Sequence, residues 1–456
     1  MPYTTVPQAS RSPSISGSRR MRAIYPALLS AILALCACPV LAQQAPASPA
    51  ESDPAAMGWM EGSPPPPDKR VLFRDGGSSQ FPKTRWSFAH IRELAPTARV
   101  SRGTGPVANL PVALRDDLDA VTFTPLGGTG TMTWAKAFED VYGDAVLVLH
   151  KGRIVYERYA GVMDPDQPHI AFSVTKSYVG TLMEMLIAEG LVDEQAPVSR
   201  YVPELAASGF GDATVRQVLD MTTALDFSEV YTDPQSGIAR FAVAAGVSPA
   251  PPGYDGPRAS YDYLPTIAKS GRHGEGFSYR SVNTEVLSWI IARVTGKRAH
   301  AVLSERIWSK LGADHDADIV VDTAGAPFTA GGLNLTLRDM ARFGEMMRQG
   351  GRFNGQQIVP VAVVEKIAAG ASKADFAKAG YGTLPGWSYK SQWWVSHNAH
   401  GAYTARGIHG QAIYIDPRAE MVIVRFASNP SASNARFDAI SLPAYQAIAE
   451  RLMQQP

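Results

Sequence analysis

The tetrad Ser173-Val174-Thr175-Lys176 carries two side chains whose spacing suits nucleophilic chemistry. Residues three apart on a helix lie on one face, within reach of each other. A serine hydroxyl becomes a good nucleophile when a neighbouring group takes its proton. Lys176 can act as that group if burial and a helix N-terminus lower its pKa. The spacing alone is weak support, because a capping serine followed by a surface lysine gives the same pattern.

Tyr279 is a second candidate for proton transfer. It precedes an apolar run from Val286 to Val294, which predicts a helix. A phenol beside a lysine can take a proton from a serine and deliver it to a leaving group. A tyrosine packed at a helix start is the structural alternative.

The segment Gly407-Ile408-His409-Gly410-Gln411 leads into a predicted strand, Gln411 to Asp416. The Ser173 N–H at a helix start can be one donor of an oxyanion hole, and a free backbone N–H of this strand segment can supply the second. His409 could serve as a general base, or it could support the strand and border a substrate cleft. No Gly-x-Ser-x-Gly segment surrounds Ser173, which favours the second interpretation.

Regular elements around these segments would position them. Ala145 to Leu149 and Arg153 to Tyr159 read as a hairpin, with Lys151-Gly152 at its turn. After Ser173, apolar residues recur at helical spacing as far as Gly190, a predicted helix end. The nucleophile candidate therefore lies at the start of a helix that follows a strand pair.

The remaining pattern predicts the fold class. Residues 191–330 are mixed helix and loop, and Leu333 to Met347 reads as an amphipathic helix opened near Thr336, with Asp339 and Arg342 as a surface pair. Strands at 411–416 and 421–426 follow, then a helix from Leu442 to Met453. We expect an α/β (α+β) fold, in which helices flank a central antiparallel sheet that carries an inserted, mostly helical domain.

The N-terminus has the pattern of an export signal. Arginines precede an apolar run, and Val40-Leu41-Ala42 fits a cleavage site, so residues 1–42 are a predicted signal peptide. The run is too short to span a membrane. The protein is therefore expected to be periplasmic or secreted, without a stable membrane span after cleavage. A lipoprotein attached through Cys38 and a start at Met21 remain alternatives.

The other predicted divisions are a solvated Pro/Ala-rich spacer, an N-terminal extension packed on the main domain, a catalytic domain with its helical insertion, and a C-terminal helix. Their ranges are 43–67, 68–140, 141–440 with the insertion at about 191–330, and 441–456.

Composition excludes some classes of function. The 456 residues include 43 basic and 42 acidic ones, for a net charge of +1, so no basic surplus indicates nucleic acid. The histidines show no metal-ligand spacing, and no metal or organic cofactor is expected. Both cysteines, Cys36 and Cys38, lie in the predicted signal. A small-molecule substrate is the expected partner, and a homodimer is left open.

Taken together and in this order, the segments resemble the penicillin-recognising serine hydrolases, which include class C β-lactamases and family VIII esterases. The branch of 6-aminohexanoate-dimer (nylon-oligomer) hydrolases is most similar. The resemblance runs from roughly Arg85 to Ser428 and rests on these segments as well: Arg85-Trp86-Ser87-Phe88-Ala89-His90, Val218-Leu219-Asp220-Met221, Tyr231-Thr232-Asp233-Pro234, Asn283-Thr284 and Gln392-Trp393-Trp394.

The resemblance implies roles for matching residues. Ser173 resembles the acylated nucleophile, Lys176 the proton acceptor and Tyr279 the acid/base partner. Ile408 is in the position that gives the second N–H of the oxyanion hole, beside that of Ser173. Substrate-contacting positions are matched by four residues: Tyr231, Ser281, Trp394 and His409. Tyr231 matches the tyrosine that meets a scissile amide nitrogen, and Trp394 a cleft aromatic.

Departures from the family pattern narrow the expected substrate. Tyr279-Arg280-Ser281 replaces Tyr-x-Asn, and no Lys-Thr-Gly is present to hold a β-lactam carboxylate. Ala242 and Ala330 stand where efficient amide hydrolases of the branch have polar residues. We therefore expect a serine hydrolase of carboxylic esters and/or small linear amides. Alternatives are a D-alanyl-D-alanine peptidase, a weak β-lactamase, and a non-catalytic cell-envelope sensor.

Overall fold

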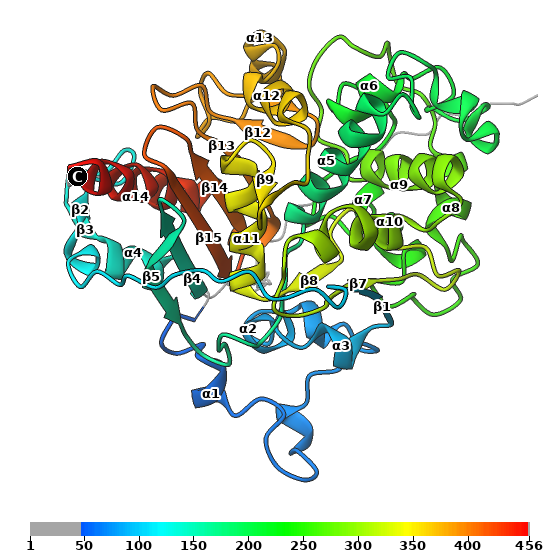
Figure 1. Ribbon diagram of the computed structural model, residues 1–456. Coiled ribbons are helices and arrows are strands. Elements are labelled where there is room, and N and C mark those ends of the chain that lie inside the picture. Colours follow the sequence, from blue (N-terminus) through cyan, green and yellow to red (C-terminus); the bar gives the residue numbers. More distant parts are fainter. Residues whose placement is uncertain (1–46, 455–456) are drawn as a thin grey trace, which may run out of the picture. The chain divides into compact units, whose positions relative to one another are not determined.

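A computed structural model describes residues 47–454 of the chain (Figure 1). The chain divides into two units, residues 1–45 and 46–456, and every element below belongs to the second. The predicted signal peptide, with Cys36 and Cys38, lies outside the described residues. No helix in the described part is both long enough and apolar enough to cross a membrane.

The centre is an antiparallel sheet in the order β11-β12-β13-β14-β15-β4-β5. Pairing of β15 with β4 joins two segments nearly 300 residues apart in sequence, as the strand–helix–strand pattern predicts. Its strands are β4 (Gly143–His150), β5 (Arg153–Tyr159), β11 (Ser388–Lys390), β12 (Trp393–Val395), β13 (Tyr403–Arg406), β14 (Ala412–Asp416) and β15 (Met421–Ala427).

Helices cover both faces of this sheet (Figure 1). Successive side chains of a strand point to opposite faces, so a strand that is apolar throughout needs two covers. In β4, Leu147 and Leu149 face the main core, which includes α11 (Leu337–Arg348). Val146 and Val148 face a second core with α4 (Trp134–Asp140) and α14 (Ala435–Met453). The continuous apolar run of β4 follows from this double burial.

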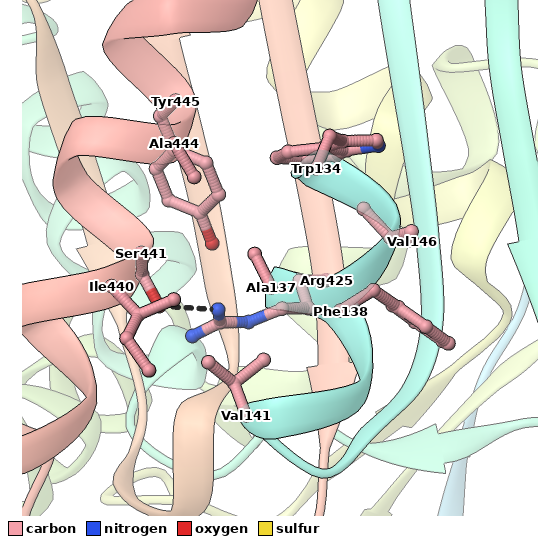
Figure 2. Close-up of a pocket in the computed structure, with 10 residues that line it drawn as sticks. All are labelled: Trp134, Ala137, Phe138, Val141, Val146, Arg425, Ile440, Ser441, Ala444 and Tyr445. Atoms are coloured by element: carbon pink, nitrogen blue, oxygen red, sulfur yellow. Dashed lines mark hydrogen bonds between the residues drawn. The ribbon is translucent and has the colours of Figure 1, made fainter. Parts of the chain in front are cut away.

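Arg425 of β15 connects the second core to the turn after β13. Its Nη1 donates to Ser441 Oγ on α14 at 2.6 Å (Figure 2), and its Nε donates to Gly410 O at 2.8 Å. The guanidinium also faces the Tyr445 ring, 5.6 Å from its centroid. The cavity beside it has about 10 Å³, so it is too small for a substrate. One side chain thus holds a helix and a loop together.

A second sheet in the order β1-β7-β8-β6 lies beside the helical region. Its strands are β1 (Thr97–Val100), β6 (His169–Ile170), β7 (Ala317–Val320) and β8 (Leu333–Leu335). The helices of this region are α5 (Val174–Ala188), α6 (Val215–Leu219), α7 (Gly237–Ala244), α8 (Ser260–Tyr263), α9 (Val282–Thr295) and α10 (Ala299–Arg306).

Shorter elements complete the described part of the chain. They are α1 (Pro54–Met57), α2 (Thr84–Ser87), α3 (Ile91–Leu94), β2 (Thr122–Phe123), β3 (Met132–Thr133), β9 (Arg352–Phe353), β10 (Gln356–Gln357), α12 (Val361–Ala369) and α13 (Lys373–Ala377).

Two predictions around α11 are wrong. Residues 333–335 form β8, which pairs with β7 and β6, and the helix begins only after Thr336, whose side chain accepts from Asp339 N–H. Asp339 and Arg342 are not a surface pair: both are buried, with 2.7 Å between Arg342 Nη1 and Asp339 Oδ1. Asp339 also accepts the N–H groups of Asp314 and His315, which explains its burial.

The two ends of the described chain also differ from the predictions. The described part of the predicted solvated spacer includes α1 and a buried Trp59, which packs with Val71 and Trp86. The C-terminal helix begins at Ala435, seven residues earlier than predicted, and includes Pro443. A helix-interior proline leaves the carbonyl four residues earlier without its donor. Here Leu126 N–H supplies that bond to Ala439 O at 2.8 Å.

Candidate active site

Ser173 lies immediately before α5, at the end of a short strand. β6 ends at Ile170, and Ala171 N–H donates to Leu333 O, which fixes the chain against β8. Phe172 then adopts φ +43°, a left-handed conformation that non-glycine residues rarely hold, and so turns the chain into the helix. As a result Ser173 is 7% exposed at a cleft, and its N–H has no hydrogen-bond acceptor among the described residues.

Lys176 is buried one helical turn further on. Its Nζ lies 2.9 Å from Ser173 Oγ and also donates to Ala330 O. Burial lowers the pKa of Lys176 to about 8, while the carboxylates of Glu229 and Glu285 act in the opposite direction. A lysine with this pKa has a substantial neutral fraction near pH 8, and a neutral amine can accept a serine proton.

Tyr279 covers the other side of Lys176, whose Nζ is 5.3 Å from the Tyr279 ring centroid. Burial raises the pKa of Tyr279 well above its usual value, and the adjacent Ser173 side chain lowers it by less. The phenol therefore stays protonated at neutral pH and is available as a donor. Trp394 packs against Tyr279 with ring centroids 5.6 Å apart and forms a wall of the cleft.

Ile408 follows β13 in a short turn, Ile408–Gly410. Gly407 makes the approach possible, because a Cβ there would lie 2.7 Å from Ala171 O. His409 closes the turn at φ +59°. Within residues 47–454 the Ile408 N–H donates to no acceptor. Ser173 and Ile408 thus present two unused N–H groups to one cleft, the requirement for an oxyanion hole.

The cleft itself has a volume of about 480 Å³, enough for a small organic substrate. Aromatic rings and charged side chains both line it. The lining includes Ser173, Glu229, Tyr231, Phe277, Tyr279, Arg280, Lys378, Tyr381, Trp394, Arg406, Ile408 and Asp438. In the part of the chain that the structure describes, no three His, Cys, Asp or Glu side chains converge as metal ligands would.

Four residues were predicted to contact substrate, and the structure places two of them in the cleft lining: Tyr231 and Trp394. Ser281 lies behind it, where its N–H (3.1 Å) and hydroxyl both donate to Glu229. His409 is also outside the lining. Its Nδ1 is 2.7 Å from Asn429 O, its ring packs on Phe88, and burial lowers its pKa to about 4. This placement favours a supporting role for His409.

Glu229 and Glu285 are two carboxylates of the site that sequence reasoning missed. Glu229 lines the cleft and accepts a hydrogen bond from Tyr231 Oη at 2.9 Å. Its position two residues before Tyr231 was the available signal. Glu285 lies in the apolar stretch of α9, where a lone acid among aliphatic residues gives no spacing pattern. Ala242 and Ala330, predicted at substrate-facing positions, do not line the cleft.

Comparison with known proteins agrees with this geometry. Residues 132–442 match the protein family described as Beta-lactamase. The chain belongs to this family. The chain is 40% identical over 352 residues to the 6-aminohexanoate-dimer hydrolase of Paenarthrobacter ureafaciens. The aligned region covers 77% of this chain and 87% of that relative.

Solved structures agree as well. A Bacillus anthracis protein assigned as a 6-aminohexanoate-dimer hydrolase has a TM-score of 0.78 and 34% identity, over 86% of this chain and all of that one. EstCE1, a hydrolase with promiscuous acyltransferase activity, shares the fold at a TM-score of 0.54 and 17% identity, over 69% of this chain and 98% of its own. The chain is accordingly a serine hydrolase of ester or amide bonds, with the expected β-lactamase-like fold.

Proposed function

We propose that Ser173 is the nucleophile of a two-step hydrolase for small carboxylic esters and short linear amides of the 6-aminohexanoate-dimer type. The observation that carries the proposal is the 2.9 Å contact between Ser173 Oγ and the buried Nζ of Lys176. Burial gives Lys176 a lowered pKa, so the serine has a neighbouring base. The contact lies at the rim of a cleft large enough for such substrates.

The first step acylates Ser173. Neutral Lys176 takes the hydroxyl proton as Ser173 Oγ attacks the substrate carbonyl carbon, and the carbonyl oxygen becomes an oxyanion. The N–H groups of Ser173 and Ile408 bind that oxygen. The carbon–oxygen or carbon–nitrogen bond then breaks, and Tyr279 donates a proton to the leaving group. Lys176 returns the proton to Tyr279, since Nζ lies beside the phenol ring.

The second step releases the acyl group. Water takes the place of the leaving group, gives a proton to Lys176 and attacks the ester carbonyl, and the same two N–H groups bind the oxyanion. Ser173 Oγ leaves as the hydroxyl after it regains the proton. Every proton that moves has a named carrier, so the residues described are sufficient for the cycle.

Replacement of Ser173 by alanine tests the nucleophile. The Ser173→Ala variant should lose turnover of a short nitrophenyl ester and labelling by a fluorophosphonate probe, while its melting temperature stays near that of the parent. Turnover near the parental rate would refute the role of Ser173. A parent protein that neither turns over esters nor reacts with the probe would support the alternative of a non-catalytic sensor.

A substrate panel ranks the acyl compounds. We expect the nitrophenyl ester to be the fastest substrate and the 6-aminohexanoate dimer to be slower. The Tyr-x-Asn and Lys-Thr-Gly segments of β-lactamases are both missing, so a chromogenic cephalosporin should be the slowest. Faster turnover of the cephalosporin than of the ester would overturn this order.

Export to the periplasm or the medium is a further part of the proposal. The N-terminal sequence supports it, with a predicted cleavage after Ala42. Mass spectrometry of the mature protein should find Gln43 at its N-terminus. A lipid-modified N-terminus at Cys38 would replace this proposal with membrane anchoring.

A further inference from the structure

Arg280 differs from the other cations of the cleft in its pairing. Lys378 lies 2.7 Å from an Asp375 oxygen, and Arg406 lies 2.6 Å from an Asp438 oxygen. Among residues 47–454, no carboxylate lies within ion-pair distance of Arg280. An arginine in a partly buried site without a direct ion-pair partner is costly, and a ligand can supply that partner.

The hydrogen bonds of Arg280 also leave donor capacity unused. Its Nη1 donates to Tyr279 O at 3.1 Å, while its buried Nε has no acceptor among the described residues. Burial lowers the pKa of Arg280, while the charge of Glu229 acts in the opposite direction. Glu229, which lines the same cleft, already accepts hydrogen bonds from Ser281 and Tyr231.

We propose that Arg280 binds a substrate carboxylate, so that the cleft selects esters and linear amides that carry a carboxylate near the scissile bond. The inference deepens the proposed function and rests on it. Arg280 follows Tyr279 directly and lines the same cleft as Ser173, so a substrate at Ser173 can reach both. A planar guanidinium suits a carboxylate because it offers parallel N–H donors.

Matched ester pairs test the proposal on each side of the scissile bond. The acyl arm compares the nitrophenyl monoester of glutaric acid with its methyl-capped diester. The leaving-group arm compares 4-acetoxybenzoate with its methyl ester. In at least one arm the parent should prefer the carboxylate in kcat/KM by about 10-fold, the worth of one charge-assisted hydrogen bond.

The Arg280→Gln variant should lose this preference and keep its kcat/KM for the methyl-capped esters within a few-fold. Arg293→Gln is the matched control and should keep the preference, because Arg293 lies further along the chain on α9, is exposed and is paired with Glu204. Equal or better turnover of the capped esters by the parent in both arms would overturn the inference, as would a preference retained without Arg280. Failure of the proposed function would show elsewhere, as capped-ester turnover that survives Ser173→Ala.

Glu285 supports a second, independent inference about Lys176. Its side chain is fully buried on α9, where Oε1 accepts Ala330 N–H at 2.7 Å and Oε2 accepts Thr329 Oγ1 at 3.0 Å. No lysine or arginine of the described chain lies within ion-pair distance of it. Ala330 in turn accepts Lys176 Nζ at its carbonyl. One residue therefore connects the carboxyl group to the proposed base.

We infer that Glu285 is a positioning residue that holds the 329–330 segment against Lys176 and, when ionised, favours the ammonium form of that lysine. Lys176 faces four groups: Ser173 and Ala330 by hydrogen bonds, the Tyr279 ring, and the charge of Glu229. Burial raises the pKa of Glu285 to about 7, so it titrates in the range where the lysine does.

The Glu285→Gln variant separates charge from shape, because the amide oxygen can still accept the Ala330 N–H. Without the negative charge, Lys176 should lose its proton more easily. The acidic limb of kcat/KM on a neutral ester should move to lower pH by about one unit. Glu345→Gln, which removes a buried carboxylate bound to Arg348 on α11, is the matched control and should leave the limb in place. If the acidic limb of kcat/KM stays at the same pH in Glu285→Gln, the inference is overturned, even if the variant is slower than the parent.

Discussion

The pH dependence of acylation is the most direct test of the proposed base. If neutral Lys176 accepts the Ser173 proton, kcat/KM must follow the fraction of neutral amine. With the pKa of Lys176 lowered by burial to about 8, that fraction is about 1% at pH 6, about 50% at pH 8 and about 90% at pH 9. The rate constant should therefore rise about 50-fold from pH 6 to pH 8 and less than about twofold above that.

The assay uses an uncharged nitrophenyl ester, so that only the enzyme titrates. Hydrolysis by the Ser173→Ala variant at each pH gives the background to subtract. A limb near pH 10.5, where an exposed lysine titrates, would refute the reasoning from burial. Lys176→Met, which keeps the volume of the side chain, should lower kcat by about 100- to 10,000-fold at every pH. If Lys176→Met keeps the parental pH dependence, the group that titrates is not Lys176.

Three further substitutions test the frame around the site. Gly407→Ala brings a Cβ against a backbone carbonyl at 2.7 Å, so kcat/KM on the ester should fall by about 100-fold through a displaced oxyanion hole, with little change in melting temperature. Arg342→Ala leaves Asp339 charged and buried, and urea unfolding should show a loss of about 3–5 kcal/mol. Pro443→Ala should change the unfolding free energy by less than about 1 kcal/mol, since the carbonyl of Ala439 already has a donor.

The sequence predicted the elements whose pattern is local. The apolar run of β4, the helix after Ser173 and the strand pair near the C-terminus all stand where expected. Residues 333–335 were assigned to the wrong class because Leu-Asn-Leu continues the apolar spacing of α11, and only pairing with β7 makes it a strand. The start of α14 was missed for a similar reason. Pro443 is tolerated inside the helix because Leu126, from a loop distant in sequence, donates to the Ala439 carbonyl.

The site was predictable as far as its motifs reach. Ser173, Lys176, Tyr279 and Ile408 meet at one cleft, as the resemblance implies. The partners that tune them were not predictable, because Glu285 and Ala330 meet only when α9 and the 329–330 segment pack together. That Arg280 has no ion-pair partner among the described residues could not be predicted either. It depends on the directions of carboxylates that are distant in sequence.

Arg425 has a consequence for handling the protein. Its guanidinium bonds both Ser441 on α14 and the Gly410 carbonyl in the turn that carries Ile408. Loosening the C-terminal helix therefore releases a proposed oxyanion donor more than thirty residues away in sequence. A truncation that removes Ser441 is therefore expected to lower activity through the Ile408 turn as well as to expose the second core. On slow heating, we expect ester hydrolysis to be lost at a lower temperature than most of the secondary structure.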